Sequence, residues 1–167
     1  STLKEIVLDQ IDGYPIQTVC NKAFQNSDIK SVELGSNVEN IDYRAFENCT
    51  SLEIFDAQNN DSLKTIENYA FNNCKNLLYV YIPSTIKSIG GYCFQYDTKC
   101  TVMFECLNAT GISLGEKWNG YDASSEVLQQ KSNSIKRTIY NVSYWSYDAK
   151  TKQLSYTTND GTVVTNR

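Results

Sequence analysis

A short pattern of alternating apolar and polar residues recurs along the first two thirds of the chain. Its copies read "LKEIVL", "IKSVEL", "LEIFDA" and "LLYVYI", and a fifth, degenerate copy reads "KCTVMF". The common form is L-x-x-I-x-L. Alternation with a period of two is typical of a β-strand. Each copy therefore predicts a strand that buries its first, fourth and sixth residues and turns its third and fifth residues outward.

A second pattern, I-x-x-I-x-x-x-A-F, follows each predicted strand and sets the length of the repeat. One unit of this length cannot bury its own apolar face, so the period predicts a solenoid of stacked coils. The phenylalanines should form an aromatic ladder on the side away from the strands, and a short helical turn is expected at residues 43–48. The small residue and phenylalanine recur at steps of 22, 25 and 23 residues, as Ala23-Phe24, Ala45-Phe46, Ala70-Phe71 and Cys93-Phe94.

Composition removes several classes of function. Charged residues make up 20 % of the chain and the net charge is −4, which argues against nucleic-acid binding because that needs clustered Lys and Arg. No apolar run is long enough for membrane insertion. The absence of histidine excludes Ser-His and Cys-His pairs and His-containing zinc sites, and the six cysteines lack the close paired spacing of an all-cysteine zinc site. We therefore expect no catalytic residue, metal site or cofactor.

The full repeat, I-x-x-I-x-x-x-A-F-x-N-C-x-x-L-x-x-I-x-I-P, is most complete in "IENYAFNNCKNLLYVYIP" at residues 66–83. It resembles the BspA-like leucine-rich repeats of secreted and cell-surface proteins, over about residues 3–106. The resemblance implies a leucine-rich-repeat solenoid with parallel β-strands on one face and short helical or 3-10 turns and loops on the other. The family is a scaffold used mainly for binding and adhesion, so the resemblance is specific for fold and not for a ligand.

The cysteines and asparagines of the repeat have structural interpretations. Cys49 and Cys74 share a repeat position and should be stacked neighbours; free buried thiols are the favoured interpretation and a disulfide is the alternative. Ser27 and Asp97 take that position in the first and fourth copies. Asparagines two places after each phenylalanine predict a ladder that caps backbone groups in the turns, formed by Asn26, Asn48 and Asn73.

The strand-lined face is the candidate binding surface. Its outward positions change from polar and acidic in the first coils to apolar and aromatic in the last. Tyrosine and methionine are enriched in the cores of interfaces, and exposed apolar patches often mark contacts. The alternative is that the C-terminal segment or a neighbouring domain covers this patch. The candidate patch consists of Ile54, Asp56, Tyr79, Tyr81 and Met103.

The repeat ends near Trp118, and the remaining residues suggest a different structure. We divide the chain into a solenoid of four to five coils with a terminal coil (1–119), a linker or short helix (120–135), and a β-hairpin or three-stranded sheet (136–167). The last segment alternates apolar and polar residues around the turn signals "DAKTK" and "NDG". It is either a cap on the last coil or part of a following β-domain. Trp145, Tyr144 and Tyr147 suggest a sugar platform, although packing within a small sheet is the commoner arrangement.

These observations favour a non-catalytic recognition or adhesion module of a secreted or cell-surface protein. It would bind a protein or glycoprotein partner, such as a host extracellular-matrix or surface protein, through the strand-lined face, and would be monomeric. Two alternatives stay open: a structural spacer that presents a neighbouring domain, and an accessory carbohydrate-binding module of a larger surface enzyme.

Overall fold

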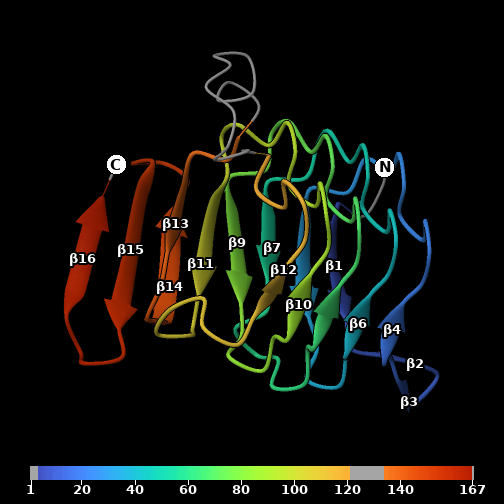
Figure 1. Cartoon of the computed structure of the whole chain (residues 1–167), viewed down its shortest axis with the longest axis horizontal. Helices are drawn as coiled ribbons and strands as arrows, with labels where there is room; N and C mark the ends of the chain where they lie inside the picture. The colour runs from blue at the N-terminus through green and yellow to red at the C-terminus, as the bar shows by residue number, and fades with distance from the viewer. Residues whose placement is uncertain (1–3, 121–133, 167) are drawn as a thin grey trace.

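A computed structural model describes residues 4–120 and 134–166, so the predicted linker at 120–135 lies almost entirely outside the described residues. Within these ranges the chain forms a parallel β-solenoid followed by a small antiparallel sheet (Figure 1). The five strands predicted from the alternating pattern build the first sheet together with β13, in the order β1-β5-β7-β9-β11-β13. Their bounds are β1 Glu5–Leu8, β5 Ser31–Leu34, β7 Ile54–Asp56, β9 Tyr79–Ile82, β11 Thr101–Phe104 and β13 Arg137–Ile139.

A second parallel sheet, which the repeat pattern did not predict, lies in front of the first in Figure 1. Each of its strands has two residues, and the first four along the chain end on the second aliphatic residue of the I-x-x-I motif. The pairing places Val19 beside Ile41 and Ile41 beside Ile66, so these side chains enter the core as a row. In the order β12-β10-β8-β6-β4, the strands are Ser113–Leu114, Ser88–Ile89, Thr65–Ile66, Asn40–Ile41 and Thr18–Val19.

The helical turn expected at residues 43–48 is wrong. The structure has hydrogen-bonded turns there, and no described residue is helical. The backbone gives the reason, because Arg44 and Asn48 have φ angles of 58° and 59°, in the left-handed region that a right-handed helix does not allow. Tyr69 and Asn73 repeat these angles one coil later.

The aromatic ladder is confirmed and forms the centre of the core. Phe24, Phe46, Phe71 and Phe94 stack with ring centroids 5.2–5.3 Å apart and ring planes 6° apart. Phe55 from β7 packs against Phe46 and Phe71 from the strand side. Burial of each large apolar side chain contributes roughly 1.5–3 kcal/mol. Because this burial requires the rings to stack directly on one another, the ladder helps to align successive coils.

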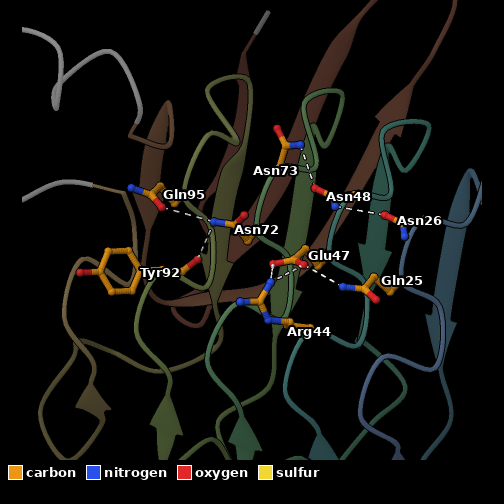
Figure 2. Close-up of polar contacts among 9 residues, drawn as sticks. All are labelled: Gln25, Asn26, Arg44, Glu47, Asn48, Asn72, Asn73, Tyr92 and Gln95. Carbon is orange, nitrogen blue, oxygen red and sulfur yellow. Dashed lines mark hydrogen bonds and ion pairs between the residues drawn. The ribbon is translucent and has the colours of Figure 1, made fainter.

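The predicted asparagine ladder is present, but among the described residues its side chains bond to one another and not to the backbone groups that they were expected to cap (Figure 2). The Nδ2 of Asn48 donates to Oδ1 of Asn26 at 3.0 Å, and the Nδ2 of Asn73 donates to Oδ1 of Asn48 at 2.8 Å. All three residues are in the left-handed conformation, which asparagine tolerates better than most residues. Asparagine is therefore favoured at this position both for its backbone conformation and for its side-chain amide.

The cysteine position of the repeat forms a buried column. The Cys49 thiol donates to the Phe24 carbonyl at 3.0 Å, and the Cys74 thiol donates to the Phe46 carbonyl at 3.2 Å, so these cysteines are free thiols bonded to the backbone. Asp97 occupies the same position in the fourth coil and is fully buried. Its Oδ1 accepts the Cys74 N–H at 2.8 Å, while Oδ2 has no hydrogen-bond partner among the described residues.

Stability should depend on pH through Asp97. Burial raises the pKa of this carboxyl well above its ordinary value, so the native state keeps the proton that the unfolded chain releases near pH 4. Stability is therefore greatest below pH 4 as far as this group is concerned, and it falls as pH rises toward the raised pKa. Asp97→Asn keeps an oxygen for the Cys74 N–H and does not titrate. Its melting temperature, relative to the parent protein, should increase steadily from pH 4 to pH 7.

Thermal unfolding at pH 4, 5.5 and 7 measures this effect. Surface ionisation is common to both proteins and cancels in the comparison. Glu5→Gln, which removes an exposed carboxyl from β1, is the matched control with which the change for Asp97→Asn is compared. A constant difference for Asp97→Asn would mean that the buried carboxyl is ionised in the native state.

The C-terminal residues form four strands, of which one, β13, belongs to the solenoid and three form a separate sheet. β13 pairs in parallel with β11, so the first sheet continues beyond the predicted end of the solenoid at residue 119. The three runs separated by the two turn signals form the antiparallel sheet β14-β15-β16 (Val142–Asp148, Gln153–Thr158 and Val163–Asn166). A two-stranded hairpin of β2 (Gln10–Ile11) and β3 (Tyr14–Pro15) projects from the first coil.

Candidate binding surface

The outward residues of the first sheet form two rows across the coils. They are the positions at which the alternating pattern places outward side chains, and the register aligns them between neighbouring strands. The first row is Glu5, Ser31, Ile54, Tyr79 and Thr101, and the second is Val7, Glu33, Asp56, Tyr81 and Met103.

The C-terminal sheet covers the aromatic half of this face. Tyr79, Tyr81 and Met103 are only 9 %, 1 % and 0 % exposed, and with Val142, Trp145 and Leu154 they form a second apolar core. The hydroxyl of Tyr81 donates to the Val142 carbonyl at 2.8 Å. Of the two interpretations left open for these three residues, the open patch is wrong and its alternative is correct, because β14–β16 of the C-terminal segment cover them.

Trp145 is the centre of this contact. Its ring lies 5.7 Å from that of Tyr79, its indole N–H donates to Asp56 Oδ1 at 3.3 Å, and its backbone N–H donates to Gln58 Oε1 at 3.1 Å. Tyr147 packs against the same tyrosine at 4.9 Å. The side chain of Trp145 is 5 % exposed, so it packs within the protein and does not form a sugar platform in this structure.

The N-terminal half of the face is open and contains two adjoining hollows. The first, of about 370 Å³, lies over β1, β5 and β7, and the second, of about 280 Å³, reaches Tyr147 and Ala149 of the C-terminal segment. Glu5, Ser31 and Ile54 line both hollows. We call the two hollows together the N-terminal groove; its floor is the strand-lined face and one wall is residues 147–149.

Charge in the N-terminal groove is mainly negative. Glu5, Glu33 and Asp56 line the first hollow, and Glu53 lines the second beside Lys30, with which it forms an exposed ion pair at 4.0 Å. Exposed pairs of this kind contribute little to stability. Apolar area comes from Ile54 and from Val7, which is 61 % exposed. Partners with an apolar and positively charged surface suit this lining.

The buried cysteines of the repeat are not activated nucleophiles, and the described residues contain no metal cluster. Burial raises the pKa of the Cys49 thiol to about 11 and raises the pKa of Cys74 and Cys93 as well, so these thiols are protonated near neutral pH. Among residues 4–120 and 134–166, no group of three or more His, Cys, Asp or Glu side chains is arranged to hold a metal ion. The same residues contain no helix that could cross a membrane.

The sequence identified the floor of the groove and missed its wall. Lys30 and Glu53 line the second hollow and were not among the candidates, and Tyr147 was considered only as part of a sugar platform. A usable signal was present, because Trp145 and Tyr147 share one face of a seven-residue strand and that apolar face needs a partner. Of the candidates, Ile54 and Asp56 line the groove, whereas Tyr79, Tyr81 and Met103 lie beneath the C-terminal sheet.

Repeated coils, a parallel sheet with equivalent residues in register and a stacked phenylalanine ladder define a leucine-rich-repeat solenoid. Residues 17–117 match the family model of the BspA type leucine rich repeat region, in six copies. The chain therefore belongs to the BspA-type leucine-rich repeat family. No curated protein matches the chain.

Solved structures that are similar to this chain include two leucine-rich repeat proteins. The leucine-rich repeat protein of T. pallidum, TpLRR, shares 29 % identity and a TM-score of 0.59 over 68 % of this chain and 52 % of its own. A leucine-rich repeat protein from Bacteroides capillosus shares 27 % identity and a TM-score of 0.52, over 62 % of this chain and 77 % of its own. The present chain thus spans about half the length of the T. pallidum protein.

Proposed function

We propose that the protein is a non-catalytic recognition module of a secreted or cell-surface protein and binds a macromolecular partner through the N-terminal groove. The observation that carries this proposal is the open groove itself, next to a half of the same face that the protein's own sheet already covers. Membership of a repeat family whose fold presents a continuous strand-lined face supports the same role.

The partner we propose is a protein or glycoprotein. The groove extends over three strands and along the C-terminal segment, and its lining mixes carboxylates with Val7 and Ile54. A long, shallow surface of mixed polarity is typical of contacts with macromolecules, whereas small-molecule sites are deeper and mostly apolar. The resemblance to surface proteins supports an extracellular location.

A substitution that fills the groove tests this role. Ser31 lines both hollows, so Ser31→Tyr should block both of them, and Ser36→Tyr adds the same bulk at an exposed turn residue outside the groove. We expect measurable binding of the parent protein to at least one of immobilised fibronectin, laminin or collagen. Ser31→Tyr should weaken that binding at least about tenfold, the equivalent of 1.4 kcal/mol, and Ser36→Tyr should leave it unchanged.

Two results would contradict the proposal. Unchanged binding by Ser31→Tyr would exclude the groove as the contact surface. Absence of binding to all three probes would favour the spacer alternative, in which the solenoid only holds a neighbouring domain in place. Retained melting temperatures, measured in parallel, ensure that a loss of binding does not come from unfolding.

A further inference from the structure

The first four coils are joined on the turn side by the same three backbone hydrogen bonds. In each case alternate N–H groups of one turn donate to three carbonyl oxygens of the following coil. The central bond joins Phe24 N–H to the Ala45 carbonyl at 2.8 Å and Phe46 N–H to the Ala70 carbonyl at 2.8 Å. The flanking bonds of the first pair are Lys22 to Tyr43 at 3.1 Å and Asn26 to Glu47 at 2.9 Å. The direction of these three bonds is constant, because the earlier coil donates each of them.

The first coil has the acceptor half of this pattern without the donors. By the repeat register, the carbonyls of Asn21, Ala23 and Gln25 correspond to those of Tyr43, Ala45 and Glu47. Within residues 4–120 and 134–166, no backbone N–H donates to these three oxygens. The asparagine amides run in the opposite direction, since each Nδ2 donates to the preceding coil. In Figure 2 the Nδ2 of Asn26 lies on the side away from Asn48.

The apolar end of the first coil is open at the same place. A hollow of about 200 Å³ is lined by Ile16, Val19 and Phe24 together with neighbouring residues of the first coil. Phe24 is the half-buried end of the phenylalanine ladder, whereas Phe46 is fully buried one coil later. β1 and β4 are edge strands of the two parallel sheets at this end. Backbone acceptors, a ring face and two strand edges thus face the same direction.

We propose that this end of the solenoid is a docking surface for one further coil of the same repeat, joined covalently ahead of residue 1. The register defines what this coil must contain. Three alternate backbone N–H groups would donate to the carbonyls of Asn21, Ala23 and Gln25. A phenylalanine would stack on Phe24, and a side-chain amide oxygen would accept from the Nδ2 of Asn26. An unrelated apolar segment could fill the hollow, but it would not place N–H donors opposite the three carbonyl oxygens. A coil of the same repeat would fill the hollow and donate these three hydrogen bonds.

The opposite end of the solenoid is closed. β13 adds to β11, Tyr140 stacks on Phe104 with centroids 5.0 Å apart, and Trp118 packs edge-on against Phe94 at 6.3 Å. These groups occupy the surface on which a following coil would stack. A second copy of the chain docked head to tail on the first coil is therefore disfavoured, which is why we commit to a covalently attached coil.

Fusion of an extra coil tests the proposal. A copy of residues 29–51 joined directly ahead of Leu3 continues the repeat period and supplies all the required donors. We expect a single unfolding transition with a melting temperature raised by about 5 °C or more, because a stacked coil adds an interface. Slower amide hydrogen exchange in β1 and β4 should accompany it. An unchanged melting temperature, with the added coil digested by protease, would overturn the proposal.

Two controls make the test specific. The same fusion with Phe46→Ser in the copied coil only should lose most of the gain. Phe24→Ala should lower the melting temperature more in the fused protein, where this ring is enclosed, than in the unmodified chain. Sedimentation of the unmodified chain should show a monomer; a dimer that Phe24→Lys dissociates would show that a second copy occupies this end and would overturn the proposal. None of these readouts involves the N-terminal groove.

Discussion

Phe71→Ala is expected to lower the free energy of unfolding by about 3–5 kcal/mol, the usual cost of removing a large buried aromatic side chain. The ring of Phe71 is fully buried and contacts Phe46, Phe94 and Phe55. Its loss leaves a cavity between two coils that cannot close, because the backbone hydrogen bonds on both sides keep the coils at a fixed spacing. Urea denaturation followed by tyrosine and tryptophan fluorescence measures the change.

Phe24→Ala is the matched control for this prediction. It removes the same ring from the same repeat position, but Phe24 stacks on one neighbour only and is half-buried. Its cost should be clearly smaller than that of Phe71→Ala. Equal costs would show that the ladder does not act through enclosed packing and that each phenylalanine matters only within its own turn.

Trp145→Ala should release the C-terminal sheet from the strand-lined face. The substitution removes the ring contact with Tyr79 and the indole hydrogen bond to Asp56, and truncation of a buried tryptophan costs about 3–5 kcal/mol. Because β14–β16 contact the solenoid through one small apolar core, the loss should appear as local opening of that sheet. Amide hydrogen exchange in β14–β16 should become about 100-fold faster or more, whereas exchange in β5 and β7 should change little.

Tyr144→Ala tests whether this effect is specific. Tyr144 is the neighbour of Trp145 on the same strand, but its side chain is 60 % exposed and faces away from the contact. The variant should leave hydrogen exchange near that of the parent protein. If Trp145→Ala instead unfolded the entire chain in one step, the sheet and the solenoid would be a single cooperative unit.

The sequence was sufficient to predict the solenoid because the same pattern of apolar and small residues recurs in several copies at a nearly constant spacing. A single copy of "YRAFEN" is compatible with a helical turn, and that expectation was wrong. The column of left-handed residues at Arg44, Tyr69 and Tyr92 explains the error. Such angles come from hydrogen bonds between coils, as in the Arg44 N–H to Asn68 carbonyl bond at 3.2 Å, and an isolated segment does not contain that partner.

The candidate patch also shows that local sequence patterns do not reveal contacts with distant segments. The register of Tyr79 and Tyr81 followed from the alternation, but their exposure depends on a segment more than sixty residues later. The Tyr81–Val142 hydrogen bond spans 61 residues and the Trp145–Asp56 bond spans 89. Local periodicity carries no information at that range, so the sequence left open whether the patch was covered. The wall of the groove was missed because it comes from the same distant segment.

The way in which the C-terminal sheet attaches to the solenoid has a mechanical consequence. β16 is the last strand, and β14, β15 and β16 follow the first sheet in the chain while their apolar face rests on β9 and β11. A pulling force on the C-terminus would therefore lift these strands before it loaded the coils. Residues 142–166 span roughly 80–90 Å when fully extended. The sheet would thus act as an extensible buffer that absorbs tension while the stacked coils remain intact.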